Sequence, residues 1–211
     1  MNIYDFDGTI FPGDCSIGFF FWCLKSHPNL MLTHFPKTAQ NLLLRMKDEI
    51  NEAEMQREFF GYLTQIDDFD YQIERYWDVN EKKIAPWYLA QKREDDLIIS
   101  ASPNCIIEPI AKRLGVRYMA TDYNREYGVF LNKMKFAKEK ARYILDQGYP
   151  VIENFYSDSL SDTPLALLAE KAHLVTNNAT TVTDWPALDE KTIAEVKKKT
   201  DMGWDSYVKE D

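Results

Sequence analysis

The chain has 211 residues, of which 45% are hydrophobic and 14% aromatic, and it carries a formal net charge of -9 at pH 7. This length and apolar content suffice for a packed core, so the sequence predicts a folded globular protein. The acidic balance argues against non-specific binding of nucleic acid or of an anionic membrane, because both are themselves negatively charged. A small soluble molecule is therefore the expected partner.

Nothing in the sequence predicts a membrane span or a secretory signal. The longest apolar run, Ile17–Leu24, is much shorter than the roughly 20 residues that a spanning helix needs, and the amino terminus is acidic where a signal peptide would be basic. We therefore expect a cytoplasmic protein. Cys15, Cys23 and Cys105 are odd in number and form no CxxC pair, so we expect reduced, structural cysteines.

The chain opens on a short strand that ends in two carboxylates. Asn2–Phe6 carries the apolar residues of a strand and Gly8 supplies a turn, which places Asp5 and Asp7 at the carboxyl end of the strand. Like charges at this spacing repel each other. They are tolerated when a metal cation lies between them, or when one of them holds a proton for chemistry.

The next part of the sequence, from about Ser16 to Lys92, reads as helical. Apolar residues recur at helical spacing, without the alternation of β-branched residues that is typical of strands. We expect helices at 16–27, 37–50, 52–66, 69–83 and 85–92.

From Asp95 onward, strands and helices alternate. Such alternation predicts a parallel sheet covered by helices, and the opening strand belongs to it by character. The helical block is then an insertion after the first strand. We expect strands at 96–102, 116–123, 152–158 and 173–177, and helices at 106–115, 135–148 and 163–172.

Polar side chains follow the later strands at the edge of the sheet where open parallel sheets bind ligands. Ser100 has no evident local role, whereas Ser102 suits the N-cap and Pro103 the first turn of the following helix. Asp158 ends a later strand, and Asp162 enters the helix after it. We expect Ser100 and both acids near Asp5 and Asp7, together with one lysine from the helix that Lys133, Lys135, Lys138 and Lys140 open.

Together these residue types suit phosphoryl transfer. A carboxylate nucleophile needs its repulsion from an anionic phosphate cancelled, which Mg2+ on acidic ligands provides. A lysine and a hydroxyl stabilise the phosphoryl oxygens, and a second carboxyl group protonates the leaving oxygen.

The ordered set "DFDGT", "IISAS", a lysine at a helix start and "YSDSLSD" resembles the motifs of the haloacid dehalogenase superfamily, specifically its phosphoserine-phosphatase-like branch with a helical cap. The resemblance spans the chain to about Trp185. It implies an α/β fold with a Rossmann-like parallel sheet core and an inserted all-helical cap domain. The core would comprise residues 1–14 and 93–185 and the cap residues 15–92, followed by a charged C-terminal segment at 186–211.

The resemblance also implies a Mg2+-dependent phosphatase that hydrolyses a small phosphorylated metabolite through a phosphoaspartate intermediate. Asp5 would be the nucleophile and Asp7 the general acid and base. Ser100 and one lysine would bind the phosphoryl group. Counting from Gly128 places Lys140 at the family position. The apolar residues after it follow the spacing of an amphipathic helix, which also favours Lys140.

A shift of two residues in that loop would make Lys138 the lysine instead. The implied metal ligands are Asp5, Asp7 through its backbone carbonyl, and Asp158, with Asp162 supporting either the metal-bound waters or the lysine. Thr9 matches a position that helps to orient the acid, and the implied substrate-binding residues are Thr9, Asp14 and Ser100.

The resemblance predicts a substrate other than phosphoserine. Asp14 can read an amino group, but Phe59 stands where an arginine is expected to pair with the substrate carboxylate, and Arg57 lies two positions away. Burying that carboxylate unpaired would cost on the order of several kcal/mol. Most aromatic residues of the block are expected to form the cap core.

Two other interpretations are open. Receiver domains use similar groups as a phospho-aspartate switch, but they place the phosphorylated aspartate on a later strand and have no helical block after the first. A non-catalytic protein that retained the fold is the second alternative, against which the intact motifs argue.

Overall fold

The structure is a computed structural model, and it describes residues 1–46, 52–131, 139–141, 144, 147–148, 151–191 and 194. Its centre is a 6-stranded sheet in the order β3-β2-β1-β6-β7-β8. Neighbouring strands pair in parallel, except that β8 pairs antiparallel with β7 at one edge. The predicted α/β fold with a parallel sheet is thereby confirmed. The strands are β1 (Asn2–Tyr4), β2 (Leu97–Pro103), β3 (Arg117–Thr121), β6 (Ile152–Ser157), β7 (Ala169–Thr176) and β8 (Thr181–Asp184).

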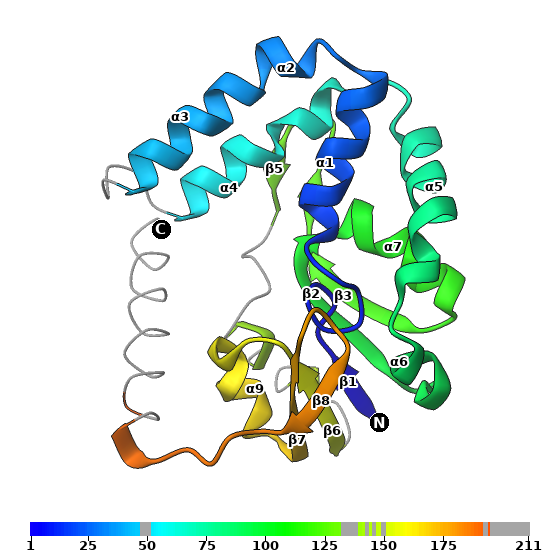
Figure 1. The fold of residues 1–211 in the computed structure, drawn as a ribbon, viewed down its shortest axis with the longest axis vertical. Helices are drawn as coiled ribbons and strands as arrows, with labels where there is room; N and C mark the ends of the chain where they lie inside the picture. Colours follow the sequence, from blue (N-terminus) through cyan, green and yellow to red (C-terminus); the bar gives the residue numbers. More distant parts are fainter. Residues whose placement is uncertain are drawn as a thin grey trace.

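The described residues between β1 and β2 are helical or lie in short connections, as the apolar spacing predicted. Figure 1 shows α1 to α4, coloured blue to cyan, beyond the end of the sheet, with α5 and α6 running back toward it. The elements are α1 (Cys15–Ser26), α2 (Leu30–Thr33), α3 (Phe35–Met46), α4 (Glu52–Phe60), the 3-10 turn η1 (Gly61–Gln65), α5 (Phe69–Asn80), the 3-10 turn η2 (Glu81–Lys83) and α6 (Pro86–Gln91).

The helical segment and the sheet share one apolar cluster. Trp77 of α5 packs edge-on against Phe6 with ring centroids 5.9 Å apart, and its indole nitrogen donates to the carbonyl oxygen of Ile106 at 3.0 Å. Tyr88 of α6 packs edge-on against Tyr4, with ring centroids 4.8 Å apart. The second half of the helical segment is therefore anchored on the sheet region and on the helix after β2 that contains Ile106.

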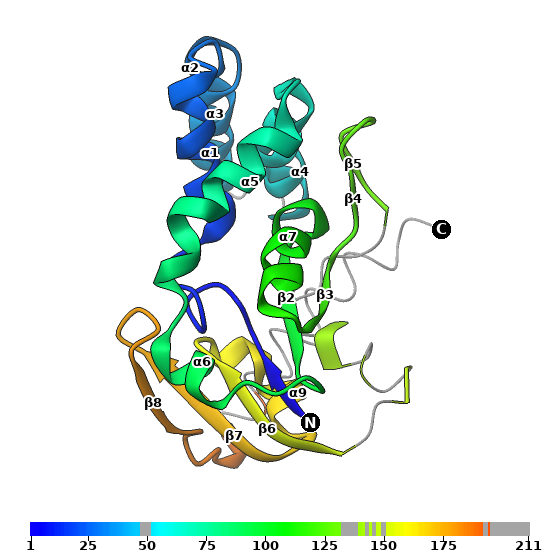
Figure 2. The ribbon, with the colours of Figure 1, turned by 90° about the vertical axis from the view of Figure 1, so that its right-hand side faces the viewer.

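A hairpin links the sheet to the outer helices. After β2, helix α7 (Asn104–Leu114) packs on β2 and β3, and the chain then forms β4 (Tyr123–Asn124) and β5 (Val129–Phe130). The strand predicted at 116–123 is therefore broken after Thr121. Figure 2 shows the hairpin rising beside α4, where the phenol of Tyr123 donates to the carbonyl oxygen of Phe60 at 2.9 Å.

The helix predicted at 163–172 is wrong in its second half. Helix α9 (Thr163–Ala166) is short, and β7 already begins at Ala169. Parallel pairing with β6, which sets Ala169 opposite Ile152, outweighs the local helix propensity of this segment. Most of the helix predicted at 135–148 lies outside the described residues, although residues 139–141 are helical.

Two expectations from composition can be compared with the structure. Cys15, Cys23 and Cys105 are all free thiols, as predicted. Within the described part of the chain, no helix combines the length and the apolar character that crossing a membrane requires.

Candidate active site

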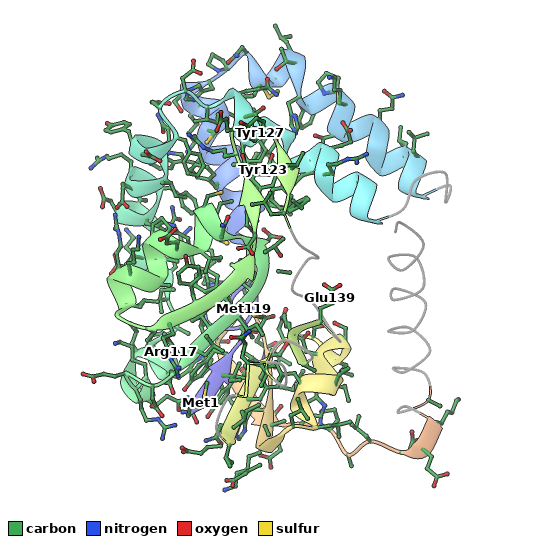
Figure 3. All side chains as sticks on the ribbon, turned by 180° about the vertical axis from the view of Figure 1, so that it is seen from behind. Met1, Arg117, Met119, Tyr123, Tyr127 and Glu139 are labelled. Carbon is green, nitrogen blue, oxygen red and sulfur yellow. The ribbon has the colours of Figure 1, made fainter. Side chains whose placement is uncertain are left out.

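A cavity of about 490 Å³ lies where the carboxyl ends of the central strands face the helical segment. Asp5, Asp7, Ser100, Lys140 and Asp162 line it from the sheet side. Figure 3 shows Glu139, the neighbour of Lys140, on the sheet side, and Tyr123 and Tyr127 on the hairpin that reaches the outer helices. The structure thus brings most of the predicted site residues to one cavity.

Lys140 joins two carboxylates in this cavity. Its ammonium group donates to Asp5 Oδ1 and to Asp162 Oδ2, each at 2.8 Å, and the residue is only 3% exposed. Ser157 Oγ also donates to Asp162 Oδ2 at 2.8 Å. Of the two lysines considered, Lys140 therefore lies beside Asp5, whereas Lys138 lies outside the described residues.

The charges around Lys140 are unbalanced. Burial raises the pKa of Asp5 and the carboxylate of Asp162 raises it further, while Lys140 opposes both effects. Burial alone would lower the pKa of Lys140, but Asp162 and Asp5 together raise it above its ordinary value. The pKa of the neighbouring Asp158 is also raised, mainly by burial. An excess of carboxylate over cationic charge fits a divalent metal ion, which prefers oxygen ligands.

Asp7 is held at both of its carboxylate oxygens. The backbone N–H of Cys15, at the start of α1, donates to Oδ1 at 2.6 Å, and Ser102 Oγ donates to Oδ2 at 2.7 Å. Burial and the nearby carboxylate of Asp14 raise the pKa of Asp7 above its ordinary value. A carboxyl group with a raised pKa is suited to carrying a proton at neutral pH.

Ser100 and Ser102 both line the cavity, in a part of β2 where the register against β3 shifts between Ile99 and Pro103. Ser100 is 1% exposed, lines the cavity, and accepts a hydrogen bond from the backbone N–H of Ser102 at 3.0 Å. The N-cap predicted for Ser102 is wrong: β2 continues to Pro103, which is itself the N-cap residue of α7. Ser102 is the contact of Asp7 that sequence reasoning missed, because the shift of strand register between Ile99 and Pro103 leaves no signal in the residue spacing.

Thr9 and Asp158 lie together beside the cavity. The backbone N–H of Asp158 donates to Thr9 Oγ1 at 2.9 Å, and neither residue is among the described cavity-lining side chains. Thr9 was expected to act in substrate binding, but it is fully buried at 0% exposure and ties the loop after β1 to the loop after β6. It therefore acts here by positioning a loop.

The other predicted binding residue, Asp14, lines the cavity and is the N-cap of α1. Its Oδ1 accepts from the backbone N–H of Ile17 at 2.9 Å, which satisfies one of the free amides at the start of the helix. Asp14 therefore has a structural role in addition to any contact with a ligand.

The side of the cavity opposite the acids is largely apolar. Phe59 and Phe60 of α4 line it together with Met55, whereas Arg57 is exposed and not among the lining residues. This agrees with the register that placed Phe59, rather than Arg57, toward the site. Among the described lining residues, Lys140 is the one cation.

Among the described residues, histidine, cysteine, aspartate and glutamate side chains do not form a cluster of three or more that could hold a metal ion. The implied set does not require such a group, because Asp7 would contribute a backbone carbonyl. Asp162 is already bonded to Lys140 and Ser157, which suits its implied role in supporting the lysine.

The sheet is parallel, paired aspartates follow its central strand, and these aspartates face a helical segment that is inserted after that strand. A model of the haloacid dehalogenase-like hydrolase family matches residues 3–167. The chain belongs to this family, which confirms the resemblance inferred from its motifs. No curated protein sequence matches it.

Solved structures share the fold at low sequence identity. A protein of unknown function from Bordetella pertussis Tohama I has a TM-score of 0.67 and 17% identity, over 82% of this chain and 87% of that chain. A probable phosphoserine phosphatase from Vibrio cholerae has a TM-score of 0.60 and 14% identity, over 81% of this chain and 55% of that one. A hydrolase of the same family from Salmonella enterica serovar Typhi has a TM-score of 0.53 and 13% identity, covering 80% and 60%. These similarities show a common fold.

Proposed function

We propose that this protein is a phosphatase that hydrolyses a small phosphomonoester through a phosphoaspartate intermediate and depends on Mg2+. The observation that carries the proposal is the environment of Asp5. Its Oδ1 accepts from the buried Lys140, while no described residue donates to its Oδ2, and Asp7 stands two residues away at the same cavity. One carboxylate is thus positioned for attack on phosphorus and the other for proton transfer.

The reaction would proceed in two displacements. Asp5 attacks the phosphorus atom, the bond between phosphorus and the ester oxygen breaks, and Asp7 gives its proton to the leaving alcohol. Water then attacks the phosphorus of the phosphoaspartate and gives a proton to Asp7, while the bond between phosphorus and the Asp5 oxygen breaks. Orthophosphate leaves, and both side chains return to their starting states. Asp7 therefore acts once as acid and once as base.

The phosphoryl oxygens would be bound by Ser100 and Lys140. The oxygen of Ser100 accepts from the backbone of Ser102, so its own proton is available to a ligand in the cavity, since no described residue accepts it. Lys140 supplies a permanent positive charge beside Asp5. Both stabilise charge on the transferring phosphoryl group.

The residues that would hold Mg2+ are Asp5, the backbone carbonyl of Asp7, and Asp158. Asp162 would support them through Lys140 and Ser157. When bound, the ion would offset the negative charge of the phosphoryl group and of the clustered carboxylates.

The division into a core and a cap is part of the proposal. The core would comprise residues 1–14 and 93–185, with residues 15–92 as the cap and 186–211 as a C-terminal segment. The cavity between the strand ends and α3 and α4 supports this division. Its volume of about 490 Å³ suits a small metabolite.

Release of phosphate from 4-nitrophenyl phosphate, with Mg2+ and with a chelator, tests the proposal. Asp5→Asn removes the nucleophile and should lower turnover by several orders of magnitude, about as much as loss of a nucleophile costs elsewhere. Asp67→Asn, on an exposed aspartate, is the matched control and should retain activity. Full activity of Asp5→Asn would refute the mechanism.

The same assay separates the alternatives. A non-catalytic protein of this fold would release no phosphate. A receiver-like switch would accept phosphate on Asp5 from acetyl phosphate without turning over an ester.

A further inference from the structure

Ser102 contacts the proposed acid directly, and neither the motifs nor the family match assigns it a role. Its hydroxyl donates to Asp7 Oδ2 at 2.7 Å, it lines the cavity, and it is 7% exposed. A hydrogen bond to a carboxylate in such a buried place is stronger than one between neutral groups.

A second serine fixes the direction of this hydrogen bond. Ser16, in the first turn of α1, donates from its hydroxyl to Ser102 Oγ at 2.9 Å and is 2% exposed. A serine hydroxyl has one proton to donate. Because Ser102 accepts the proton of Ser16, its own proton is directed to Asp7.

We propose that Ser102 is the positioning residue of the general acid, with Ser16 holding the Ser102 hydroxyl in place. The inference rests on the proposed function, because it assigns Asp7 the proton for the leaving oxygen. Cys15 N–H holds one oxygen of Asp7 and Ser102 Oγ the other, so the two donors together fix the plane of the carboxyl group. A positioned acid transfers its proton efficiently, whereas a rotating one spends less time aligned.

The contribution of Ser102 can be separated from phosphoryl binding. Its backbone N–H donates to Ser100 Oγ, and its side chain donates to Asp7. Ser102→Ala removes the side-chain hydrogen bond while keeping the backbone one. The variant should therefore affect protonation of the leaving group and leave the Ser100 hydroxyl in place.

Esters that differ in their leaving group provide the readout. Benzyl phosphate and 4-nitrophenyl phosphate are similar in size, but the alkoxide of the first must be protonated as it departs, whereas the nitrophenolate of the second leaves without help. Ser102→Ala should lower kcat/KM for benzyl phosphate by about 10- to 100-fold, as expected for loss of a hydrogen bond to a charged group. For 4-nitrophenyl phosphate the loss should stay below about threefold.

The ratio of the two values is measured on one preparation, so any unfolded fraction cancels. Ser16→Ala should change this ratio in the same direction by a smaller factor. Ser161→Ala is the control: Ser161 lines the same cavity, its hydroxyl contacts Ser159, and both esters should be affected equally.

Equal losses for the two esters in Ser102→Ala would overturn the role of Ser102 while leaving the phosphatase intact. Absence of phosphate release by the wild-type protein would instead refute the proposed function, and the role of Ser102 with it.

Discussion

Lys140 is the cation that compensates the negative charge of the buried carboxylates in the site. It is 3% exposed and contacts Asp5, which follows β1, and Asp162, which lies in the 3-10 turn after β6. Replacing it by alanine removes both the phosphoryl contact and the cation that compensates two buried carboxylates. Leaving such charges unpaired destabilises a fold by roughly 3–5 kcal/mol.

We predict that Lys140→Ala lowers kcat/KM by at least about 100-fold, comparable to the loss of one stabilising donor in other active sites. Lys138→Ala, two residues earlier, should have a much smaller effect. Steady-state measurement of kcat/KM for both variants with one aryl phosphate shows which of the two lysines serves the site. The opposite order would mean that Lys138 is the lysine of the site.

Gly8 allows the loop after β1 to approach Asp158. Its φ is +72°, and a Cβ at this position would lie 2.1 Å from Asp158 Oδ2. Gly13 has a similar φ of +76°, but a Cβ there would meet no atom within 4 Å. Comparing alanine variants of the two glycines therefore separates the effect of backbone strain from the effect of displacing the Asp158 carboxylate.

We predict that Gly8→Ala raises the Mg2+ concentration needed for half-maximal activity by about 10-fold or more, because displacing a metal-site side chain typically costs that much affinity. Gly13→Ala should carry only the cost of left-handed backbone, about 1–2 kcal/mol of stability. Mg2+ titrations and thermal unfolding of both variants check this. Similar Mg2+ dependence in the two would show that Asp158 does not serve the metal.

At the level of elements, helix α4 determines what the cavity offers to the leaving group. Phe59 and Phe60 line it with Met55, while Arg57 is exposed. Aromatic rings favour an apolar or ring-bearing group, whereas a substrate carboxylate needs a cationic partner.

We predict that phosphoserine does not rank first when phosphorylated metabolites are compared by kcat/KM at fixed Mg2+. Arg57→Ala should change kcat/KM by less than about threefold, as expected for an exposed charge. Phe59→Arg should improve phosphoserine relative to phenyl phosphate. A clear preference for phosphoserine that Arg57→Ala abolishes would show that the arginine reaches the site.

At the scale of the whole molecule, the helical segment has an anchored half and an outer half. Trp77 and Tyr88, from α5 and α6, pack on Phe6 and Tyr4 of the sheet region. Helices α3 and α4 extend away from the sheet (Figure 1), and their side chains contribute to the lining of the cavity. If the cap moves as a lid, its hinges lie near Gly13 and near Lys92, where the helical segment leaves and rejoins the sheet region. We expect this motion to be largest in α3 and α4.

We predict that beryllofluoride with Mg2+ slows hydrogen exchange in α3 and α4 and leaves exchange in α5 nearly unchanged, because the ligand would hold the outer helices over Asp5. Exchange measured by mass spectrometry with and without beryllofluoride gives the comparison. The Asp5→Asn variant, which cannot form the complex, is the control. Identical exchange throughout the segment would contradict a closing cap.

The alternation of strands and helices after Asp95, and the acids at the end of the first strand, could be predicted because both depend on local patterns. The helix predicted at 163–172 failed because pairing of β7 with β6 is not local. Ser102 was misassigned for a related reason: its neighbour Pro103 suggested a helix start, but β2 continues through that residue.

The sequence by itself determined the family, the parallel sheet and the candidate acids, since periodicity and motif order are properties of the chain alone. The tertiary structure decided which hydroxyl holds Asp7, which lysine lies between Asp5 and Asp162, and that α5 and α6 pack on the sheet. These contacts join residues far apart in the chain, such as Ser16 with Ser102 and Asp5 with Lys140. Spacing along a sequence does not specify such pairs, because their geometry depends on how strands register and helices pack.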